Sequence, residues 1–417
     1  MTATKRKRRS RPYTVNQKSL LLIFFLAFGT LSILILFYFL FPWERPFHGE
    51  RLSHADKPVS TPVFEEINAK NSSFINEIIK IDHAVYESLY KGGIPEENIL
   101  FLSVSPRHEK RNEWDFTELW VKLPSNDSAL QLTKILENAL SSAKPNVRYK
   151  VERVSQGETI LHLYALGLYT HKIRMTWDDH PAPLYHHRVP KVGIVIDDMG
   201  YDPFIFEDFL KLELPLAFSV LPQAPYTQSI ASKAHNAGRE LILHLPMEPA
   251  DYPHINPGPG ALLTTMRDGK IRAIIRSDLE EVPGVLGVNN HMGSLFTARR
   301  DKMAIVMSEL KKRHLFYIDS RTTTETVAPE LAEQMGVPVA SRSVFLDNDL
   351  SSTAIRFQME RLLGIARHSG AAIGIGHPNK ETLSLLKEYR EKLKTRVKLV
   401  PVSELIGHVP EVSKMHF

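Results

Sequence analysis

The chain of 417 residues contains no cysteine. It therefore has no disulfide bonds, and any site for a transition metal has to be built from His, Asp and Glu side chains. It also lacks the Gly-x-Gly-x-x-Gly and P-loop motifs, so no motif indicates nucleotide binding. These absences direct the search toward a metal site made of imidazoles and carboxylates.

A net positive charge is absent from most of the chain. The sequence has 52 Lys and Arg against 47 Asp and Glu, but residues 1–18 hold seven of the basic residues and no acidic one. The remainder, with 45 basic and 47 acidic residues, lacks the charge excess that nucleic-acid binding requires. We therefore predict a basic tail over residues 1–18 and no nucleic-acid partner.

Charged residues are also missing from residues 20–41, which consist mainly of Leu, Ile and Phe. At ~1.5 Å per residue a helix of this length spans roughly 33 Å, about one hydrocarbon core. A cleaved signal peptide is the alternative, but its apolar region is usually shorter and an Ala-x-Ala-like site follows it, whereas Phe41-Pro-Trp-Glu-Arg-Pro follows here. We predict an uncleaved single-pass anchor over residues 19–42. The positive-inside rule then keeps the tail cytoplasmic and places the chain after Trp43 on the extracytoplasmic, periplasmic side of the inner membrane.

The next segments lack any cluster of candidate catalytic residues. Residues 43–60 are polar and broken by prolines, which predicts a stalk. Residues 61–177 predict a small α+β module, with helices at 63–90 and 129–140 and strands at 116–121, 147–154, 159–166 and 168–175. Packing, substrate contact and partner contact all stay open as its role. Residues 178–190 hold three Pro and three His, a composition that predicts a linker. We favour exposed linker positions for these histidines over a role as metal ligands.

From residue 191 to 417 short apolar runs alternate with helical stretches, which is typical of repeated βα units. Strands are expected at 192–196, 216–221, 240–245, 285–288, 316–318, 339–341, 371–375 and 398–400. Helices are expected at 229–237, 301–313, 327–334, 352–368 and 381–393. Seven or eight such units predict an α/β fold, a distorted (β/α)7-8 barrel. An open doubly wound sheet is the alternative.

Polar residues follow several of these strands at the end where chemistry occurs in α/β folds. Asp197 and Asp198 follow the first strand, and His244, His291, Asp319 and His377 follow later ones. One Asp could instead cap the next helix, and any single His is more often structural. Because the carboxyl ends of barrel strands face one mouth, their shared position favours a joint site.

Two imidazoles and one carboxylate, with a coordination position left open, are a recurring set for a catalytic divalent ion. Asp198, His244 and His291 can supply this set. Such an ion lowers the pKa of a water molecule, and Asp197 would act as general base toward it. His377, flanked by glycine in Gly374-Ile-Gly-His-Pro378, is placed to protonate a leaving group.

With these residues the chain resembles the divergent polysaccharide deacetylases of the YibQ type, over about residues 190–408. The resemblance rests on Asp197-Asp198, His244-Leu-Pro-Met-Glu248, Asn289-Asn-His-Met-Gly-Ser294 and Gly376-His-Pro378. It implies a distorted (β/α) barrel related to the NodB-type carbohydrate esterases, with Asp198, His244 and His291 as ligands, Asp197 as base and His377 as acid. Two esterase motifs are missing: residues 244–248 do not form a His-(Ser/Thr)-x-x-His loop, and no Arg-x-Pro-Tyr follows the fourth strand.

Five further residues are candidates for contacts around this site. Asn290 and Ser294 could hold substrate or an oxyanion, although shaping the loop is the favoured role. Glu248 could be a ligand or support one, with a surface or capping role equally open. Asp319 could orient His377 or another imidazole, and Arg342 could neutralise a carboxylate.

The sequence therefore predicts a membrane-anchored, metal-dependent hydrolase that deacetylates a cell-envelope polysaccharide, with peptidoglycan as one candidate substrate. The preferred ion is Zn²⁺, with Co²⁺, Mn²⁺ or Fe²⁺ as alternatives. A non-catalytic envelope protein that binds glycan or protein on the same barrel is the rival hypothesis. A metal hydrolase that cleaves another bond, such as a peptide amide, would use the same residues.

Overall fold

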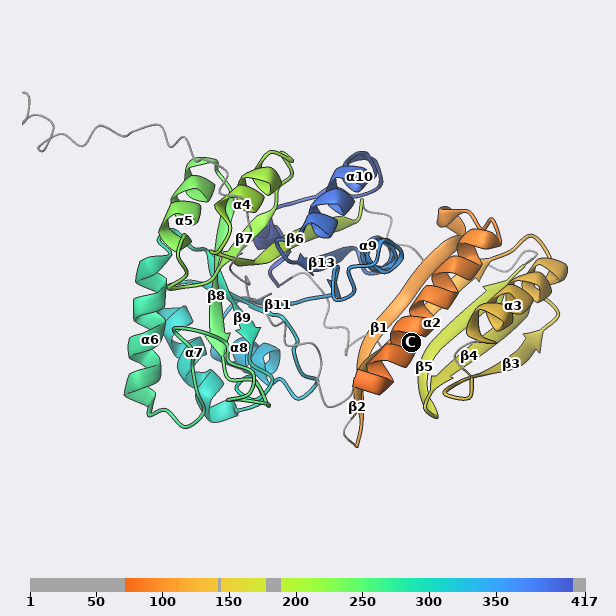
Figure 1. Cartoon of the computed structure of the whole chain (residues 1–417), viewed down its shortest axis with the longest axis horizontal. Helices are drawn as coiled ribbons and strands as arrows, with labels where there is room; N and C mark the ends of the chain where they lie inside the picture. Colours follow the sequence, from red (N-terminus) through yellow and green to blue (C-terminus); the bar gives the residue numbers. More distant parts are fainter. Residues whose placement is uncertain (1–71, 111, 142–143, 178–188, 408–417) are drawn as a thin grey trace, which may run out of the picture. The chain divides into compact units, whose positions relative to one another are not determined.

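The computed structural model describes residues 72–110, 112–141, 144–177 and 189–407, and most of its elements are labelled in Figure 1. The predicted tail (1–18), membrane span (19–42) and stalk (43–60) lie outside these residues, as do residues 178–188 of the predicted linker. None of the helices within the described ranges is both long and apolar enough to cross a membrane. The segments outside the described ranges therefore stay predictions.

Residues 72–176 form a five-stranded sheet with two helices over one face (Figure 1). The helices are α2 (Ser72–Lys91) and α3 (Asn126–Leu140), and a short 3-10 helix, η2 (Glu96–Asn98), precedes the sheet. The strands are β1 (Ile99–Glu109), β2 (Asn112–Lys122), β3 (Val147–Ser155), β4 (Glu158–Ala165) and β5 (Leu168–Thr176). Their order in the sheet is β1-β2-β5-β4-β3, and only the β2–β5 pair is parallel.

Helix α3 shows why this sequence folds into the module. Its N-cap residue Ser125 accepts a hydrogen bond from the backbone N–H of Ser128 at 3.3 Å, which satisfies one of the donors at the start of the helix. The buried residues of α3 recur at helical spacing and belong to the main core: Ala129, Leu132, Leu136 and Leu140. The helix thus buries one apolar stripe against the core.

Residues 191–407 form a second, all-parallel sheet surrounded by helices. Its strands are β6 (Lys191–Met199), β7 (Ala217–Val220), β8 (Glu240–Met247), β9 (Gly287–Met292), β10 (Phe316–Asp319), β11 (Val339–Ser341), β12 (Val344–Phe345), β13 (Ala371–Gly376) and β14 (Lys398–Leu399). Its helices are α4 (Pro203–Leu210), α5 (Thr227–Asn236), α6 (Asp268–Glu281), α7 (Arg300–Lys312), α8 (Ala328–Met335), α9 (Ser352–Ser369), α10 (Lys380–Arg396) and η4 (Val402–Leu405). The strand order is β11-β10-β9-β8-β7-β6-β13-β12, with β14 beside the start of β6.

The two ends of this strand order are joined by only two residues, Arg342 and Ser343. The N–H of Arg342 donates to the carbonyl of Asp319 on one side, and the N–H of Ser343 donates to the carbonyl of Ile373 on the other. Two residues reach at most about 7 Å, so the sheet has to curl until its first and last strands meet. The curled parallel sheet confirms the predicted α/β barrel and excludes a flat open sheet.

Because all strands of the barrel run in one direction, their carboxyl ends form a single rim. Eight of the nine residues of β6 are buried, as expected for a strand covered on both faces. The predicted catalytic and ligand residues lie in the carboxyl-terminal halves of their strands or, like His377 after β13, directly behind a strand. The fold therefore brings them to one edge of the barrel.

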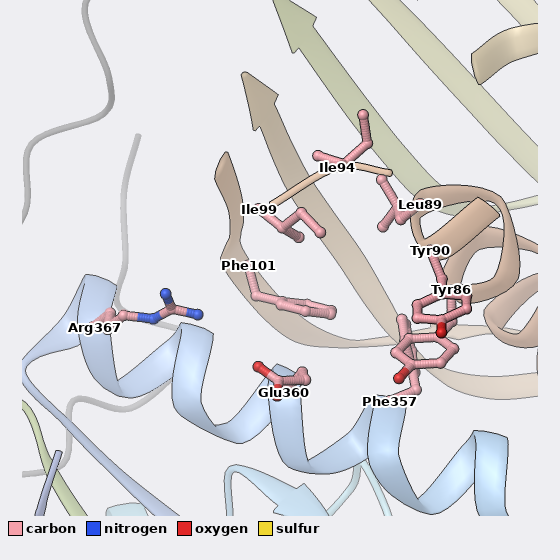
Figure 2. A pocket seen from close by; sticks show the side chains of 9 residues that line it. All are labelled: Tyr86, Leu89, Tyr90, Ile94, Ile99, Phe101, Phe357, Glu360 and Arg367. Atoms are coloured by element: carbon pink, nitrogen blue, oxygen red, sulfur yellow. The ribbon is translucent and has the colours of Figure 1, made fainter. Parts of the chain in front are cut away.

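Residues 62–417 cluster as one compact unit, within which helix α9 packs against β1 and α2. The rings of Phe101 on β1 and Phe357 on α9 meet edge to face at a centroid distance of 5.4 Å. Gly364 allows this close approach, because a Cβ atom there would lie 2.8 Å from the Phe101 ring. A small, largely apolar pocket lies beside this contact, with Glu360 and Arg367 of α9 on one side (Figure 2).

Candidate metal centre

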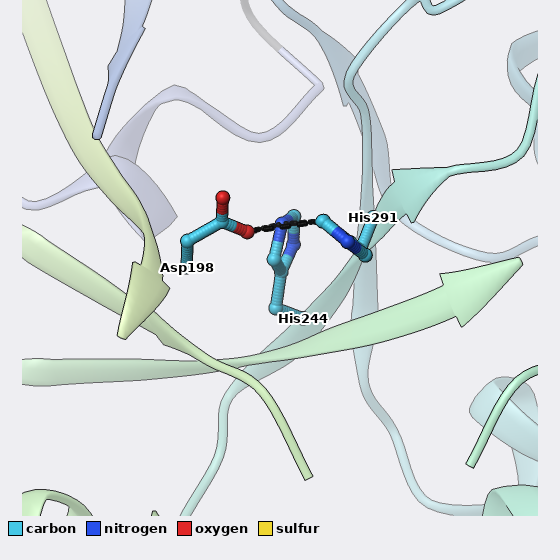
Figure 3. Close-up of side chains that lie close together, drawn as sticks. All are labelled: Asp198, His244 and His291. Carbon is cyan, nitrogen blue, oxygen red and sulfur yellow. Dashed lines mark hydrogen bonds and ion pairs between the residues drawn. The ribbon is translucent and has the colours of Figure 1, made fainter. Parts of the chain in front are cut away.

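Three side chains converge at the carboxyl rim of the barrel (Figure 3). Asp198 Oδ1 lies 3.0 Å from His244 Nε2 and 3.0 Å from His291 Nδ1, and the two nitrogens are 3.1 Å apart. All three side chains are buried. The structure thus brings together the predicted ligands from three different strands, β6, β8 and β9.

The backbone of β6 is irregular where it carries the acid pair. Asp198 has a left-handed φ of 54°, and the pairing with β7 shifts register between Ile196 and Met199. A non-glycine residue in this conformation costs roughly 1 kcal/mol. In a regular strand Asp197 and Asp198 would point to opposite faces, whereas here Asp197 Oδ2 lies 3.7 Å and Asp198 Oδ1 3.0 Å from the same nitrogen of His244. The irregularity allows two consecutive carboxylates to serve one site.

Asn289 is the residue that fixes the orientation of this cluster. Its Nδ2 donates to Asp197 Oδ1 at 2.8 Å and to Oδ2 at 3.0 Å, and its Oδ1 lies 2.8 Å from His244 Nδ1. A carboxylate only accepts hydrogen bonds, so the Asn289 amide group has to face Asp197. The amide oxygen then accepts from His244 Nδ1–H, as well as from the Ser219 hydroxyl at 2.6 Å.

With its proton on Nδ1, a neutral His244 presents a lone pair at Nε2. That lone pair faces the Asp198 carboxylate and His291 Nδ1 at about hydrogen-bond distance. Both carboxylate oxygens of Asp198 are buried, and within the described part of the chain neither accepts a hydrogen bond of acceptable geometry. Three acceptors so arranged repel one another unless a proton or a cation lies between them. Zn–N and Zn–O bonds of about 2.0–2.2 Å are compatible with donor atoms at this spacing, so the residues fit a divalent ion.

The charge states of the two carboxyl groups differ. Burial raises the pKa of Asp197, and this effect outweighs the opposing influence of His244 and His377. Burial also acts to raise the pKa of Asp198, but His291 and His244 hold it well below its ordinary value. Asp198 is therefore the permanent anion of the pair, and Asp197 is the more basic group.

His377 lines the same small pocket as Asp197, His244 and His291. Its Nδ1 contacts Asp347 Oδ1 at 2.8 Å, and its backbone N–H donates to Asp347 Oδ2 at 2.6 Å. Burial alone would lower the pKa of His377, but Asp347 beside it, with Asp198 and Asp197, raises this pKa to about 9. The imidazole is therefore protonated at neutral pH.

Four of the five other predicted residues make the following hydrogen bonds. Asn290 donates to the carbonyl of Met292 and accepts hydrogen bonds from the Tyr317 hydroxyl and the Ser320 N–H. These contacts agree with the role of shaping the loop that the sequence favoured for Asn290. Ser294 Oγ accepts from the N–H of Ala250, and Glu248 accepts from the N–H of Thr264. Glu248 does not belong to the group that could hold a metal. Arg342 donates to the carbonyls of Ser320 and Arg321.

The carboxylate that contacts His377 in the structure is not Asp319, the residue that the sequence suggested. Asp347, after β12, holds His377, whereas Asp319 Oδ1 accepts from the backbone N–H of Arg321 at 2.9 Å. Sequence reasoning missed Asp347 because β12 has only two residues and gives no periodic signal. Sequence reasoning also missed Asn289 and chose its neighbour Asn290 instead. The available signal was that Asn289 is a polar residue directly after the predicted buried strand at 285–288.

An Asp-His-His cluster at the carboxyl rim of a curled parallel barrel defines the class: an α/β-barrel protein with a candidate divalent-metal site. Residues 194–406 match the family described as divergent polysaccharide deacetylase, and the chain belongs to this family. The predicted family is thereby confirmed. The match begins within β6, so the module of residues 72–176 lies outside it.

Proteins from several bacteria are similar to about half of the chain. Uncharacterized protein YibQ of Escherichia coli K12 is 37% identical over 222 residues, which are 53% of this chain and 69% of that protein. An uncharacterized protein of Haemophilus influenzae is 33% identical over 217 residues, 52% of this chain and 76% of that protein. The crystal structure of an uncharacterized protein from Agrobacterium tumefaciens C58 is similar with a TM-score of 0.51 and 25% identity, and covers 54% of this chain and 92% of that one.

Proposed function

We propose that this polysaccharide deacetylase-like protein is a metal-dependent enzyme that hydrolyses N- or O-acetyl groups on a cell-envelope glycan. The observation that carries the proposal is the Asp198 carboxylate, which is buried without a well-formed hydrogen bond in the described residues and faces two imidazole nitrogens at 3.0 Å. An isolated buried charge is costly. A divalent cation held by Asp198, His244 and His291 removes that cost.

A divalent ion held by Asp198, His244 and His291, Zn²⁺ in this proposal with Co²⁺, Mn²⁺ or Fe²⁺ as alternatives, would act as a Lewis acid on the acetyl carbonyl and would lower the pKa of water. Asp197 takes a proton from the attacking water, because burial makes this carboxylate more basic than an exposed one. Asn289 holds Asp197 in place through both carboxylate oxygens. His377, protonated at neutral pH, gives a proton to the departing amine or alkoxide.

The proposal is tested with His291→Ala, compared with His235→Ala on the exposed face of α5 as a matched control. The control should keep one equivalent of zinc by elemental analysis and release acetate from chito-oligomers or peptidoglycan. His291→Ala should lose the zinc and reduce acetate release by at least about 10²-fold, because one of three protein ligands is missing. Stoichiometric zinc in purified His291→Ala would contradict the ligand assignment.

The parent protein also distinguishes the proposal from its rivals. A purified chain without bound metal that releases no acetate from any envelope glycan would favour a non-catalytic binding protein. Stoichiometric zinc with cleavage of a peptide amide in place of acetate release would favour a hydrolase of another bond.

We further propose that residues 20–41 anchor the protein in the inner membrane with the barrel on the periplasmic side. The support is the uncharged apolar stretch and the basic residues that precede it. A reporter enzyme that is active only outside the cytoplasm, fused after residue 60, should be active. The same fusion should lose its activity when residues 20–41 are deleted. An inactive full-length fusion would refute the topology.

A further inference from the structure

One acidic side chain of the α+β module reaches the rim of the barrel. Asp115 lies on β2, and its Oδ1 accepts a hydrogen bond from Arg321 Nη2 at 3.1 Å. Arg321 follows β10 by two residues, in the loop that also contains Ser320 of the pocket. The contact therefore joins a part of the chain outside the family match to the loop next to the candidate active site.

Three guanidinium groups, those of Arg321, Arg342 and Arg361, act on the charge of Asp115. Burial acts to raise the pKa of Asp115, but Arg321, Arg361 and Arg342 together lower it, so this carboxyl group is charged. Arg342 is 3% and Arg361 6% exposed. Within the described residues, Nε and Nη2 of Arg361 have no hydrogen-bond partner. Buried cations that lack full pairing depend on the nearest anion, and the carboxylates that act on Arg342 are Asp115 and Asp319.

The arginines bind together two short segments, residues 319–322 and 342–345, which we call the pocket wall. Arg321 Nη1 donates to the carbonyl of Arg342 at 3.2 Å. In return Arg342 Nε donates to the carbonyl of Ser320 at 2.7 Å, and Arg342 Nη2 donates to the carbonyl of Arg321 at 3.2 Å. The side chain that Asp115 holds is thus one of the two that fix the backbone of the wall.

The pocket wall contacts the candidate catalytic groups on both sides. The N–H of Ser320 donates to Asn290 Oδ1 at 2.9 Å, and the Ser320 hydroxyl accepts from Asn289 Nδ2 at 3.4 Å. The guanidinium of Arg342 lies 3.7 Å above the ring centroid of Phe345, which stacks on His377 at 5.9 Å. A displacement of the wall would therefore reach the metal cluster through Asn289 and the acid through Phe345.

From these contacts we infer that Asp115 is a positioning residue of the barrel's active site and that the α+β module completes the pocket wall. Only the kinetic consequence of this inference rests on the proposed function. The module does not depend on Asp115 for its attachment, because its apolar residues pack on α9 beside the pocket of Figure 2. Loss of the Asp115 charge is therefore expected to loosen the wall without releasing the module.

The absence of native cysteine permits a direct test in the full chain. Ser320→Cys places a single thiol in the wall at a position that is 2% exposed. The rate of its alkylation by a maleimide reports how often the wall opens. Asp115→Asn should raise this rate about tenfold, the effect of losing one charge-assisted hydrogen bond. Asp127→Asn, on the exposed first turn of α3, is the matched control and should leave the rate unchanged.

Two further variants separate the contact from a general loss of stability. Arg321→Gln removes the Asp115 contact and also the hydrogen bond to the Arg342 carbonyl, so it should raise the rate at least as much as Asp115→Asn does. The double variant should raise the rate no further than Arg321→Gln, because the Asp115 contact is already lost in that single variant. Asp115→Glu keeps the charge and should remain close to the parent. Two results would overturn the inference. One is an alkylation rate in Asp115→Asn within about twofold of the rate in Asp127→Asn. The other is a double variant whose increase in rate equals the product of the increases in the two single variants.

The kinetic measurement uses the chain without the reporter cysteine. Asp115→Asn should lower kcat for acetate release about tenfold and leave the zinc dissociation constant within about twofold, because the wall touches no ligand atom directly. An unchanged kcat together with a lower melting temperature would assign Asp115 a purely structural role and refute the inference. If the parent releases no acetate, the proposed function fails, while the alkylation rates still decide the role of Asp115.

Discussion

Replacing Asp347 with asparagine should reverse the protonation of His377. Three donors meet Asp347 Oδ2: the N–H of His377, Asn379 Nδ2 and the Thr382 hydroxyl. In Asp347→Asn the amide oxygen has to take this position, so the amide NH₂ group faces His377 Nδ1. That nitrogen then has to accept a hydrogen bond, which excludes the imidazolium form.

The size of the effect follows from the pKa of His377, which is about 9 against an ordinary value of 6.5. A difference of about 2.5 units corresponds to about 3 kcal/mol. Because the folded-state pKa is raised, this contribution to stability is fully present below pH 6.5 and is lost as the pH rises through about 9. Asp347→Asn should bring the pKa to 6.5 or below, since burial and the amide NH₂ group facing Nδ1 then both disfavour the charged ring and outweigh Asp198 and Asp197. The variant should cost about 2 to 3 kcal/mol of stability at pH 7.

The assay is a titration of the His377 ring protons by NMR in the metal-free chain, with His377→Gln to assign the signal. Asp268→Asn, an exposed acid at the start of α6, is the matched control and should leave the titration at about 9. In acetate release, the fall of kcat on the alkaline side should move down by more than two pH units in Asp347→Asn, since the general acid loses its proton earlier. A parent His377 that titrates near 6.5, or a variant that still titrates above 8, would refute the reasoning.

Two further predictions concern other buried polar groups. Asn289→Leu removes the partner of His244 Nδ1 and of Asp197, so zinc binding measured by competition with a chromophoric chelator should weaken about 10- to 100-fold; unchanged affinity would mean that Asn289 does not orient the ligand. Burial raises the pKa of Asp278 to about 7, so the stability that its neutral form provides is lost as the pH rises through 7. Asp278→Asn should therefore raise the free energy of unfolding by about 2 kcal/mol at pH 8 and by little at pH 4, and an equal change at both pH values would contradict this.

The elements that the sequence predicted best are those with a strong internal period. The runs at 192–196 and 371–375 lie within β6 and β13, and the predicted helix at 352–368 differs from α9 by one residue. The strands β8 and β9 end later than predicted, at Met247 and Met292. For β9 the prediction stopped at residue 288 because the polar residues that follow, starting with Asn289, do not continue the apolar run, although the chain remains extended through them. Hydrophobic patterning cannot indicate a strand that carries a buried polar site.

Other elements were missed for different physical reasons. Strand β1 contains Pro106 and charged residues near its end, so its pattern resembles a loop, and only pairing with β2 defines it. Helix α4 has only eight residues, and α6 follows the long segment that begins after β8. Such elements depend on tertiary contacts that periodicity within the chain does not contain.

The candidate site was predictable where one rule sufficed. The carboxyl ends of parallel strands share a rim, which was enough to place Asp198, His244 and His291 together. The partner of His377 was not predictable in this way, because Asp319 and Asp347 both follow strands of the same rim. Only the curl of the sheet decides which of the two lies beside β13.

The two-residue joint at Arg342 and Ser343 has a consequence for how the protein behaves at high concentration. Parallel sheets usually end in strands whose unpaired N–H and C=O groups can pair with another chain. Here the first and last strands of the barrel, β11 and β12, have only three and two residues and follow each other along the chain. Short edge strands are one of the ways in which natural sheets resist aggregation. The joint that closes the barrel around the pocket therefore also leaves very little edge on which an intermolecular sheet could grow.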